Sequence, residues 1–296
     1  MSHKDEIKAA ALAGFFSATV LKELASRGRS PALARLIRES GLDIDRSSPE
    51  KVGAIFDDAF TRLKRRAYRH EYVYKAALMH KVLLGIHSLK TASMVTEFRV
   101  GHCKADVVIL NGTGTVYEIK SERDGLTRLS RQVDAYSRVF ATVNVVVGEK
   151  HLSKIKNHVP DYVGLMMLSD RHQVSTLRAA IDDPNRTDPI AIFDAVNQHE
   201  ASLILQEAGK TLPDVPNTQR YTTYRKMFNT LNGPAAHFGM VSVLKRTRNL
   251  RPLSGLLKSV PESLQAAIIA TPLNNLERGR LVKALRVPIY EAVAWG

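Results

Sequence analysis

Two β-branched, apolar runs joined by a short glycine-containing segment constrain this chain more than any other feature. The runs cover residues 107–110 and 115–119, and Asn111-Gly-Thr-Gly114 lies between them. β-Branched and aliphatic residues favour strands, and glycine tolerates the positive φ angles of a tight connection. The sequence therefore predicts a β-hairpin.

Charged residues occupy particular places in this hairpin. Asp106 begins the first run, and Glu118 and Lys120 lie in the second. Side chains alternate between the two faces of a strand, so Glu118 and Lys120 project from the same face. We expect a carboxylate and an ammonium to lie side by side, close to Asp106.

A further strand is expected upstream, over residues 94–100. A two-residue turn after it would place Glu97 opposite Asp106 on one face of the sheet. Three carboxylates and a lysine would then converge. The alternative role for Glu97 is an ion pair with Lys104 or Arg99 on an exposed edge.

Grouped carboxylates repel one another unless a cation lies between them. Magnesium prefers oxygen ligands, and it can polarise a phosphodiester and lower the pKa of an attacking water. A neighbouring lysine can position that water or neutralise the growing negative charge. Asp106, Glu118 and Lys120 therefore indicate a metal-dependent nuclease site. The alternative is an exposed sheet face with a salt bridge from Lys120 to either acid.

An amphipathic helix is expected directly after the hairpin. Asp124 is its expected N-cap, and apolar residues recur at helical spacing as far as Tyr136. Gln132 and Tyr136 are four residues apart and share one face, with Arg128 and Arg131 adding positive charge nearby. Gln132 and Tyr136 are interpreted equally well as a polar residue beside a core tyrosine or as groups that position phosphate or nucleotide.

The periodicity also predicts the elements around the hairpin. A helix is expected over residues 69–83, a buried strand over 142–148, a short helix over 152–158 and a last strand over 163–168. The expected order is α, β, β, β, α, β, α, β, which is an α/β fold.

These motifs resemble the PD-(D/E)xK nuclease superfamily, which has the restriction-endonuclease-like fold. The Gln-x-x-x-Tyr spacing is similar to that of the RecB-type exonuclease branch, and the chain also resembles a poorly described bacterial and prophage-encoded group. The resemblance covers about residues 68–170. It implies an αβββαβ core with a mixed central sheet, flanked by N- and C-terminal helical regions. The residues that carry it are Glu71, Asp106, Glu118, Ile119, Lys120, Gln132 and Tyr136.

The resemblance also implies roles for these residues. Asp106, Glu118 and the backbone carbonyl of Ile119 would hold Mg²⁺ or Mn²⁺, and Lys120 would assist the attacking water. Gln132 and Tyr136 would act at the same catalytic site.

The superfamily's additional acid usually lies on the preceding helix, which implies Glu71, whereas the two-residue turn of the hairpin favours Glu97. Glu71 lies four residues before Lys75, so its alternative role is a surface ion pair. The resemblance slightly favours Glu71 as the additional metal ligand.

Net charge is +14, and it is concentrated at the two ends of the chain. Lys and Arg number 14 against 9 acids in residues 1–70, 16 against 16 in residues 71–209, and 13 against 4 in residues 210–296. We expect basic flanks to contact the phosphates of DNA, although each cluster alone could be a solvated helix face. The candidates there are Arg62, Lys64, Arg65, Arg66, Lys245, Arg246, Arg248 and Arg251.

The predicted organisation is a basic helical region over residues 1–67, a nuclease core over 68–170 and a basic helical region over 171–296. No apolar run reaches membrane-spanning length and the N-terminus is unlike a signal peptide, so a cytoplasmic location without membrane contact is expected. The chain has no Walker-type phosphate loop, so a partner protein would supply any ATPase activity or regulation.

The expected function is therefore a Mg²⁺- or Mn²⁺-dependent deoxyribonuclease. By resemblance alone, its setting is phage defence or prophage DNA processing, and a homodimer is one arrangement that would cut both strands. Two alternatives stay open. One is a catalytically silent DNA-binding or interaction protein on a nuclease fold, and the other is a nuclease that acts on RNA.

Overall fold

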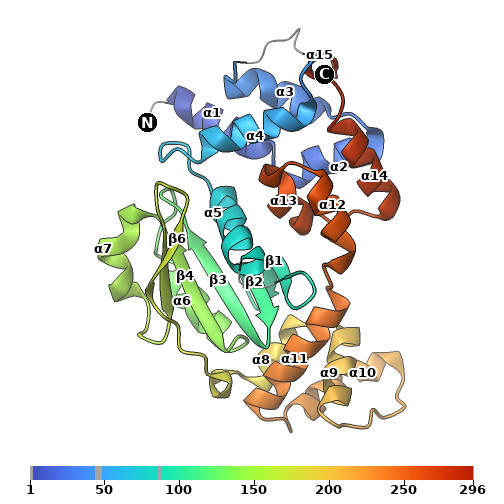
Figure 1. The fold of residues 1–296 in the computed structure, drawn as a ribbon. Coiled ribbons are helices and arrows are strands. Elements are labelled where there is room, and N and C mark those ends of the chain that lie inside the picture. Colours follow the sequence, from blue (N-terminus) through green and yellow to red (C-terminus); the bar gives the residue numbers. More distant parts are fainter. Residues whose placement is uncertain (1–2, 44–48, 86–87, 296) are drawn as a thin grey trace. The chain divides into compact units, whose positions relative to one another are not determined.

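The computed structural model describes residues 3–43, 49–85 and 88–295, which form two compact units (Figure 1). Each unit combines segments that are distant in the sequence. This division differs from the three consecutive regions expected above. Unit 1 contains Met1–Met79, Asp170–His172 and Arg251–Gly296, and unit 2 contains His80–Ser169 and Gln173–Leu250.

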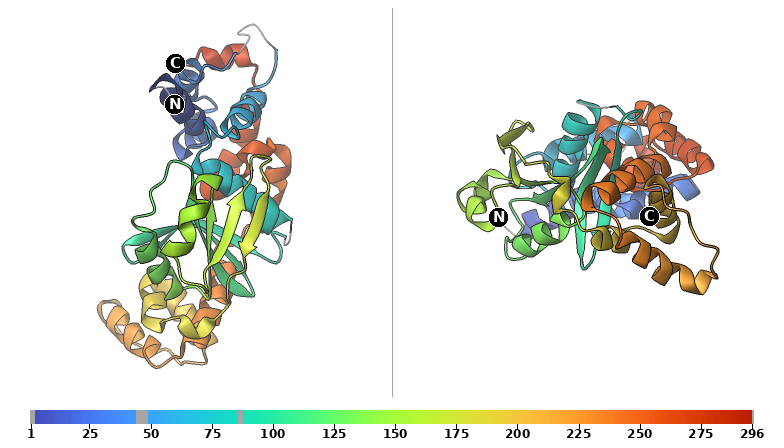
Figure 2. Two further views of the ribbon diagram at one scale, coloured as in Figure 1. Left: turned by 90° about the vertical axis from the view of Figure 1, so that its left-hand side faces the viewer. Right: turned by 90° about the horizontal axis from the view of Figure 1, so that it is seen from below.

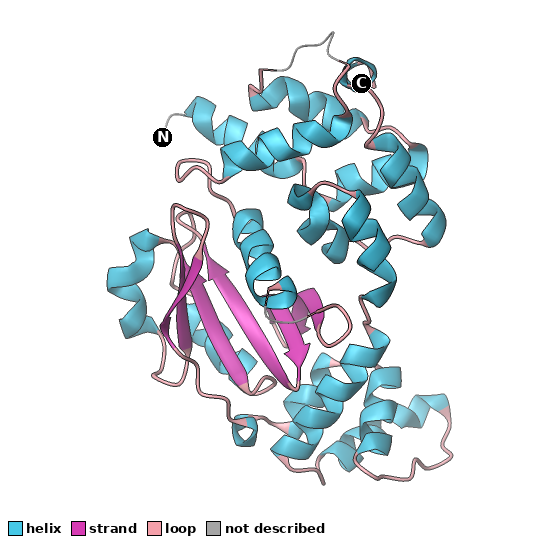
Figure 3. Ribbon diagram, in the orientation of Figure 1, coloured by secondary structure: helices cyan, strands magenta, loops and turns pink. Residues whose placement is uncertain are grey.

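A six-stranded mixed sheet forms the centre of unit 2 (Figure 3). The strands lie side by side in sequence order. The pairs β1–β2, β2–β3 and β5–β6 are antiparallel, whereas β3–β4 and β4–β5 are parallel. The expected mixed α/β class is confirmed. The strands are β1 Ser93–Val100, β2 Cys103–Asn111, β3 Thr113–Lys120, β4 Thr142–Val147, β5 Gly164–Leu168 and β6 Val174–Arg178.

The expected two-residue turn after Val100 forms, whereas the turn between β2 and β3 is shorter than the expected connection over residues 111–114. Val100 pairs with Cys103 across a two-residue turn, and Asn111 pairs with Thr113 around Gly112. Gly112 has φ +72°, a conformation that costs glycine little because it has no Cβ. The turn lengths fix the register of all three strands.

Strand β6 was not expected from the sequence. It pairs with β5 as an edge strand, and only Val174 of its five residues is buried. Because most of its side chains are polar or partly exposed, the strand lacks the apolar alternation that predicts a half-buried strand.

Helix α6 (Leu129–Ser137) connects β3 to β4 and packs on the sheet. Its buried Leu129, Val133 and Tyr136 belong to the same hydrophobic cluster as Val108 and Val145. Burying a side chain of this size stabilises the fold by about 1.5–3 kcal/mol.

The prediction that Asp124 caps α6 was wrong. The helix begins at Leu129, and Arg128 occupies the N-cap position without a side-chain hydrogen bond. Oδ2 of Asp124 instead accepts hydrogen bonds from the backbone N–H and the hydroxyl of Ser121, at 2.8 and 2.6 Å. The carboxylate therefore stabilises the turn directly after Lys120.

A short helical segment follows β4, made of η2 (Glu149–His151), α7 (Leu152–Ile155) and η3 (Lys156–His158). Four helices follow the sheet and gather at one end of it (Figures 1 and 2). They are preceded by the short turn η4 (Pro184–Arg186), and they are α8 Pro189–Ala195, α9 Gln198–Glu207, α10 Asn217–Phe228 and α11 Gly233–Thr247.

Helix α11 contacts β2 and β3, and the fully buried imidazole of His237 reaches the start of β3. Its Nε2 lies 3.1 Å from the backbone N of Gly114, and its Nδ1 lies 3.2 Å from the carbonyl oxygen of Val139. A neutral ring meets both contacts when Nδ1 carries the proton and Nε2 accepts. The histidine thus joins α11 to the start of β3.

Unit 1 is helical and combines both ends of the chain. Backbone N–H groups of Val52 and Ile289 donate to the carbonyls of Val287 and Glu50, at 2.9 and 2.8 Å. Its helices are α1 His3–Gly14, α2 Ala18–Arg27, α3 Pro31–Ser40, α4 Val52–Leu63, α5 Glu71–Leu78, α12 Ser254–Ser259, α13 Gln265–Ala270, α14 Asn275–Ala284 and α15 Ile289–Val293, with the short turns η5 Arg251–Leu253 and η6 Glu262–Leu264. The π-helical segment η1 (Met79–Leu84) continues α5 into unit 2.

Aromatic residues form much of the core of unit 1. Phe16 stacks on Tyr72 with ring centroids 4.3 Å apart, Phe56 and Phe60 pack edge-on against this pair, and Phe15 packs against Phe56. Among the described residues, no single helix has the length and apolar character to cross a membrane. One bent pair, Asp5–Gly14 with Ala18–Arg27, meets those two criteria only when its helices are taken together.

Candidate functional site

Glu118 and Lys120 form a buried ion pair between β3 and α6. Nζ of Lys120 lies 2.7 Å from Oε1 of Glu118, and the two residues are only 7% and 2% exposed. The expected proximity is confirmed. The pair does not lie on an exposed sheet face, where an ion pair contributes little.

Two residues of α6 complete this cluster. The amide of Gln132 donates to Oε1 of Glu118 at 2.5 Å and accepts from Nζ of Lys120 at 2.9 Å. The hydroxyl of Tyr136 donates to Oε2 of Glu118 at 2.9 Å. Their four-residue spacing places both groups over the ion pair. We call Glu118, Lys120, Gln132 and Tyr136 the buried cluster.

The buried cluster changes the acidity of Glu118 and Tyr136. Burial raises the pKa of Glu118, and the Lys120 ammonium together with hydrogen bonds from Lys120, Tyr136 and Gln132 opposes that rise. Burial, and then the charge of Glu118, also raise the pKa of Tyr136. Tyr136 therefore stays a hydrogen-bond donor, as a buried carboxylate requires.

Asp106 lies where the β2–β3 ladder ends. The last pair at that end is Val107 with Tyr117, and beyond it Oδ2 of Asp106 accepts a hydrogen bond from the backbone N–H of Ile119 at 2.7 Å. The carboxylate thereby replaces a ladder hydrogen bond. It is held beside the peptide that links Glu118 to Lys120 through Ile119.

Glu97 lies opposite Asp106, as the two-residue turn predicts. The ladder pairs Thr96 with Val107 and Phe98 with Ala105, and it omits the residues between them. Glu97 has φ +58°, an uncommon conformation for a residue other than glycine. One carboxylate oxygen of Glu97 lies within 4.8 Å of one of Asp106.

This irregularity changes which side chains face α6. Strict alternation would place Ala105 and Val108 on opposite faces of β2, yet both belong to the same hydrophobic cluster. The change coincides with Glu97 and Asp106, the two facing residues that the β1–β2 ladder omits. Bulge-like irregularities redirect side chains, and they are common beside functional sites.

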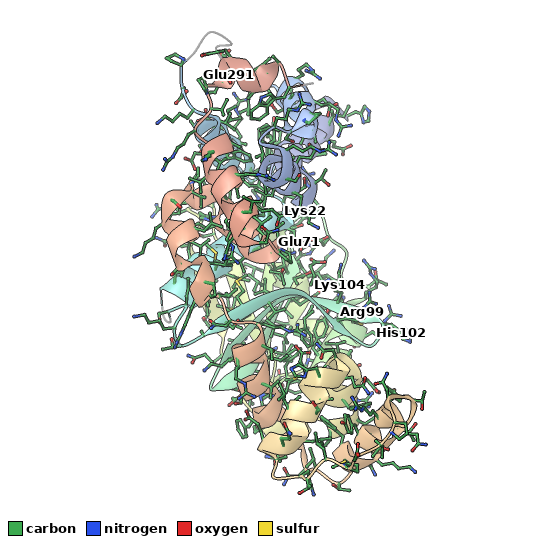
Figure 4. All side chains as sticks on the ribbon, turned by 90° about the vertical axis from the view of Figure 1, so that its right-hand side faces the viewer. Lys22, Glu71, Arg99, His102, Lys104 and Glu291 are labelled. Atoms are coloured by element: carbon green, nitrogen blue, oxygen red, sulfur yellow. The ribbon has the colours of Figure 1, made fainter. Side chains whose placement is uncertain are left out.

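Glu97 also forms the ion pair that was its alternative role, with Lys104 on β2. Lys104, Arg99 and His102 come from the β1–β2 hairpin and lie close together at its turn end (Figure 4). Glu71 belongs to unit 1, where it pairs with Lys75 at 2.7 Å, its own alternative role. A metal-binding role for either acid stays a prediction.

The predicted nucleic-acid contacts are spread over both units. Arg128 and Arg131 are exposed at the start of α6, close in sequence to Gln132. Arg248 is used inside unit 2, where it pairs with the buried Glu200 at 2.9 Å and lies over the ring of Phe98.

The remaining candidates have these positions. Arg246 pairs with Glu207, and Lys245 is half-buried on α11. In unit 1, Arg62 donates to the carbonyl of Gly41, Lys64 lies over Phe60, and Arg65, Arg66 and Arg251 are exposed.

One residue next to the buried cluster was not anticipated. His151 is buried, and its Nε2 lies 2.9 Å from the carbonyl oxygen of Ser121, which follows Lys120. The backbone N–H of Gly148 also donates to the carbonyl of Lys120 at 3.2 Å. Both contacts join residues about thirty positions apart, so no local spacing predicts them.

The fold and the site define an α/β protein with a buried carboxylate–lysine pair on a mixed sheet, beside further carboxylates. The sequence profile of the family described as Bacteriophage P4 protein cII matches residues 64–231, more than half of the 296 residues. The chain belongs to that family. The matched range contains all the catalytic and metal-ligand candidates named above.

A curated relative is similar over a shorter stretch. Protein cII of Enterobacteria phage P4 is 32% identical over 80 residues, which cover 26% of this chain and 30% of that protein. The aligned part is thus under a third of the relative's length. No solved structure gives a significant match to this chain.

Proposed function

We propose that this protein is a Mg²⁺- or Mn²⁺-dependent nuclease of the restriction-endonuclease-like type, with DNA as its expected substrate. The observation that carries the proposal is the buried cluster beside Asp106. A buried ion pair contributes little net stability, because desolvating two charges offsets their attraction. Carboxylates whose pKa is shifted by burial and by a specific charged partner are concentrated at functional sites.

The donor set fits a hard divalent cation. Asp106 and Glu97 offer carboxylate oxygens within 4.8 Å of each other, and oxygen is the ligand that Mg²⁺ and Mn²⁺ prefer. Glu118 would join them by exchanging hydrogen bonds within the buried cluster, with the carbonyl of Ile119 as a further ligand. When bound, the cation would polarise the phosphodiester and lower the pKa of the attacking water.

The side chains of the buried cluster have separate tasks in this proposal. An ammonium carries three N–H donors, and Glu118 and Gln132 account for two of those of Lys120. The third would orient the attacking water or stabilise negative charge on the phosphate. Tyr136 and Gln132 would keep Glu118 ionised and fix the position of Lys120.

The test is a nuclease assay on linear, circular and single-stranded DNA and on RNA, with Mg²⁺ or Mn²⁺. Asp106→Asn is the sharpest variant, because an amide oxygen can still accept from the Ile119 N–H while the charge is lost. We expect Asp106→Asn and Lys120→Ala to abolish cleavage and leave binding largely intact. Lys154→Ala, at an exposed lysine on α7, is the matched control. Cleavage at the wild-type rate in both site variants would refute the proposal.

A second function has an observation in its favour. Both carboxylate oxygens of Glu118 already accept hydrogen bonds, and Glu97 is already paired with Lys104. A catalytically silent nucleic-acid-binding protein would keep such contacts permanently. Tight metal-independent binding, with no cleavage under either cation, would favour that function.

A further inference from the structure

A cavity separate from the buried cluster lies among the helices that follow the sheet. Its volume is about 270 Å³, and residues of α8, α9 and α10 and of the segment between α8 and α9 line it. The cavity lies within unit 2. The lining residues are Phe193, Asp194, Val196, Gln198, Ala201 and Tyr221.

The aromatic wall of this cavity is unusually open. Tyr221 is 58% exposed, although its ring lies 5.1 Å from that of Phe193 at an angle of 56°. Phe193 is buried, and its ring lies 5.2 Å from that of Phe228. The core therefore supports one side of Tyr221 and leaves much of the ring in solvent. Aromatic rings held in this way are stacking platforms for unpaired bases.

Polar groups with defined geometry accompany the ring. The hydroxyl of Tyr221 donates to Asp194 at 3.3 Å, and the guanidinium of Arg225 lies 3.4 Å from the same carboxylate. Gln198 adds an amide to the lining. A carboxylate and an amide can pair with the polar edge of a base, whose faces are apolar.

The charge of α10 suits a polyanion. The helix has Arg220, Arg225 and Lys226 and no acidic residue, and all three cations are exposed. Arg225 lies four residues after Tyr221 and so shares its face, whereas Lys226 lies on a different face. A phosphate next to a base stacked on Tyr221 would lie within reach of Arg225.

We infer that this cavity binds an unpaired base of single-stranded nucleic acid, with the base on Tyr221, its edge at Asp194 and Gln198, and a flanking phosphate at Arg225. The inference rests on the proposed function in one respect, since it names the form of nucleic acid that the nuclease would hold. The binding itself requires neither the metal nor the buried cluster.

The test measures, by fluorescence anisotropy, how tightly the full chain binds short, labelled single-stranded DNA and RNA in the presence of EDTA. Tyr221→Ala is expected to weaken binding by about 5- to 150-fold, the range for loss of one stacked base. Tyr221→Phe should restore most of the affinity because it keeps the ring. Arg225→Ala should weaken binding and reduce the slope of log affinity against log salt concentration by about one, the value for one phosphate contact. Lys226→Ala should have a smaller effect on both.

Duplex DNA is the second control, since a paired base cannot enter the cavity. Unchanged single-strand affinity in Tyr221→Ala, or equal affinity for duplex and single strand, would overturn the inference. If cleavage depends on Asp106 but binding is unchanged in Tyr221→Ala, the nuclease proposal holds and the base-binding site is refuted. If binding depends on Tyr221 but no cleavage occurs, the base-binding site holds and the nuclease proposal is refuted. A difference between the DNA and RNA arms would identify the polymer.

Discussion

The hydroxyl of Tyr136 on α6 donates a hydrogen bond of 2.9 Å to Oε2 of Glu118 on β3, and both side chains are buried. Tyr136→Phe removes this donor and leaves the ring in place. We expect a stability loss of about 1–3 kcal/mol, because a buried acceptor loses its partner. The pKa of Glu118 should rise further, since its charged form loses a hydrogen bond. Urea denaturation and the carboxyl carbon signal in an NMR pH titration measure the two effects, and an unchanged pKa would contradict this account.

Removing the lysine of the buried pair should be more damaging. Lys120→Met leaves the Glu118 carboxylate buried without its cation, and we expect a loss of about 3–5 kcal/mol. The double variant Glu118→Gln with Lys120→Met should recover much of this, because a neutral amide is less costly to bury. Lys104→Met, which breaks the exposed pair with Glu97, should cost less than about 1 kcal/mol. If urea denaturation gives equal losses of unfolding free energy for Lys120→Met and Lys104→Met, the ion pair of Lys120 contributes no more than an exposed one.

The metal-ligand set can be tested without activity. Mg²⁺ or Mn²⁺ should raise the melting temperature of the wild-type protein, because a ligand that binds only the folded state stabilises it. Asp106→Asn should remove this shift. Comparing Glu97→Gln with Glu118→Gln then identifies the second carboxylate. Glu207→Gln, which also breaks an exposed ion pair, is the matched control and should keep the full shift. A shift that survives in Asp106→Asn would exclude this site.

His237 should make the stability of the protein depend on pH. Burial lowers the pKa of His237 below its usual 6.5, whereas the hydrogen bond to Val139 and the charge of Asp182 oppose the change. The unfolded chain then binds more protons than the folded one below about pH 6.5, so stability should fall as pH falls from there through the lowered pKa. His237→Gln should flatten this part of the profile. Urea midpoints measured from about pH 8 down to pH 5 test this, and parallel profiles for the two proteins would contradict it.

Local sequence determined most of the hairpin geometry. The two-residue turn after Val100 fixes the register of β1 and β2, and this register places Glu97 opposite Asp106. Alternation along β3 puts Glu118 and Lys120 on the same face of the strand. Helical spacing puts Gln132 and Tyr136 on the same face of α6. These relationships depend on the period of each element and on short turns, which the sequence expresses directly.

Tertiary structure decided what those residues do to one another. Because α6 packs on the sheet, Tyr136 and Gln132 contact Glu118, and the Glu118–Lys120 ion pair is buried and not solvated. Asp124, expected to cap the helix, instead accepts a hydrogen bond from Ser121. Tertiary contacts also bring both ends of the chain together in unit 1 and pair β6 with the edge of the sheet at β5. Burial and long-range pairing depend on which distant surface covers each face, and the period of a local segment contains no information about that surface.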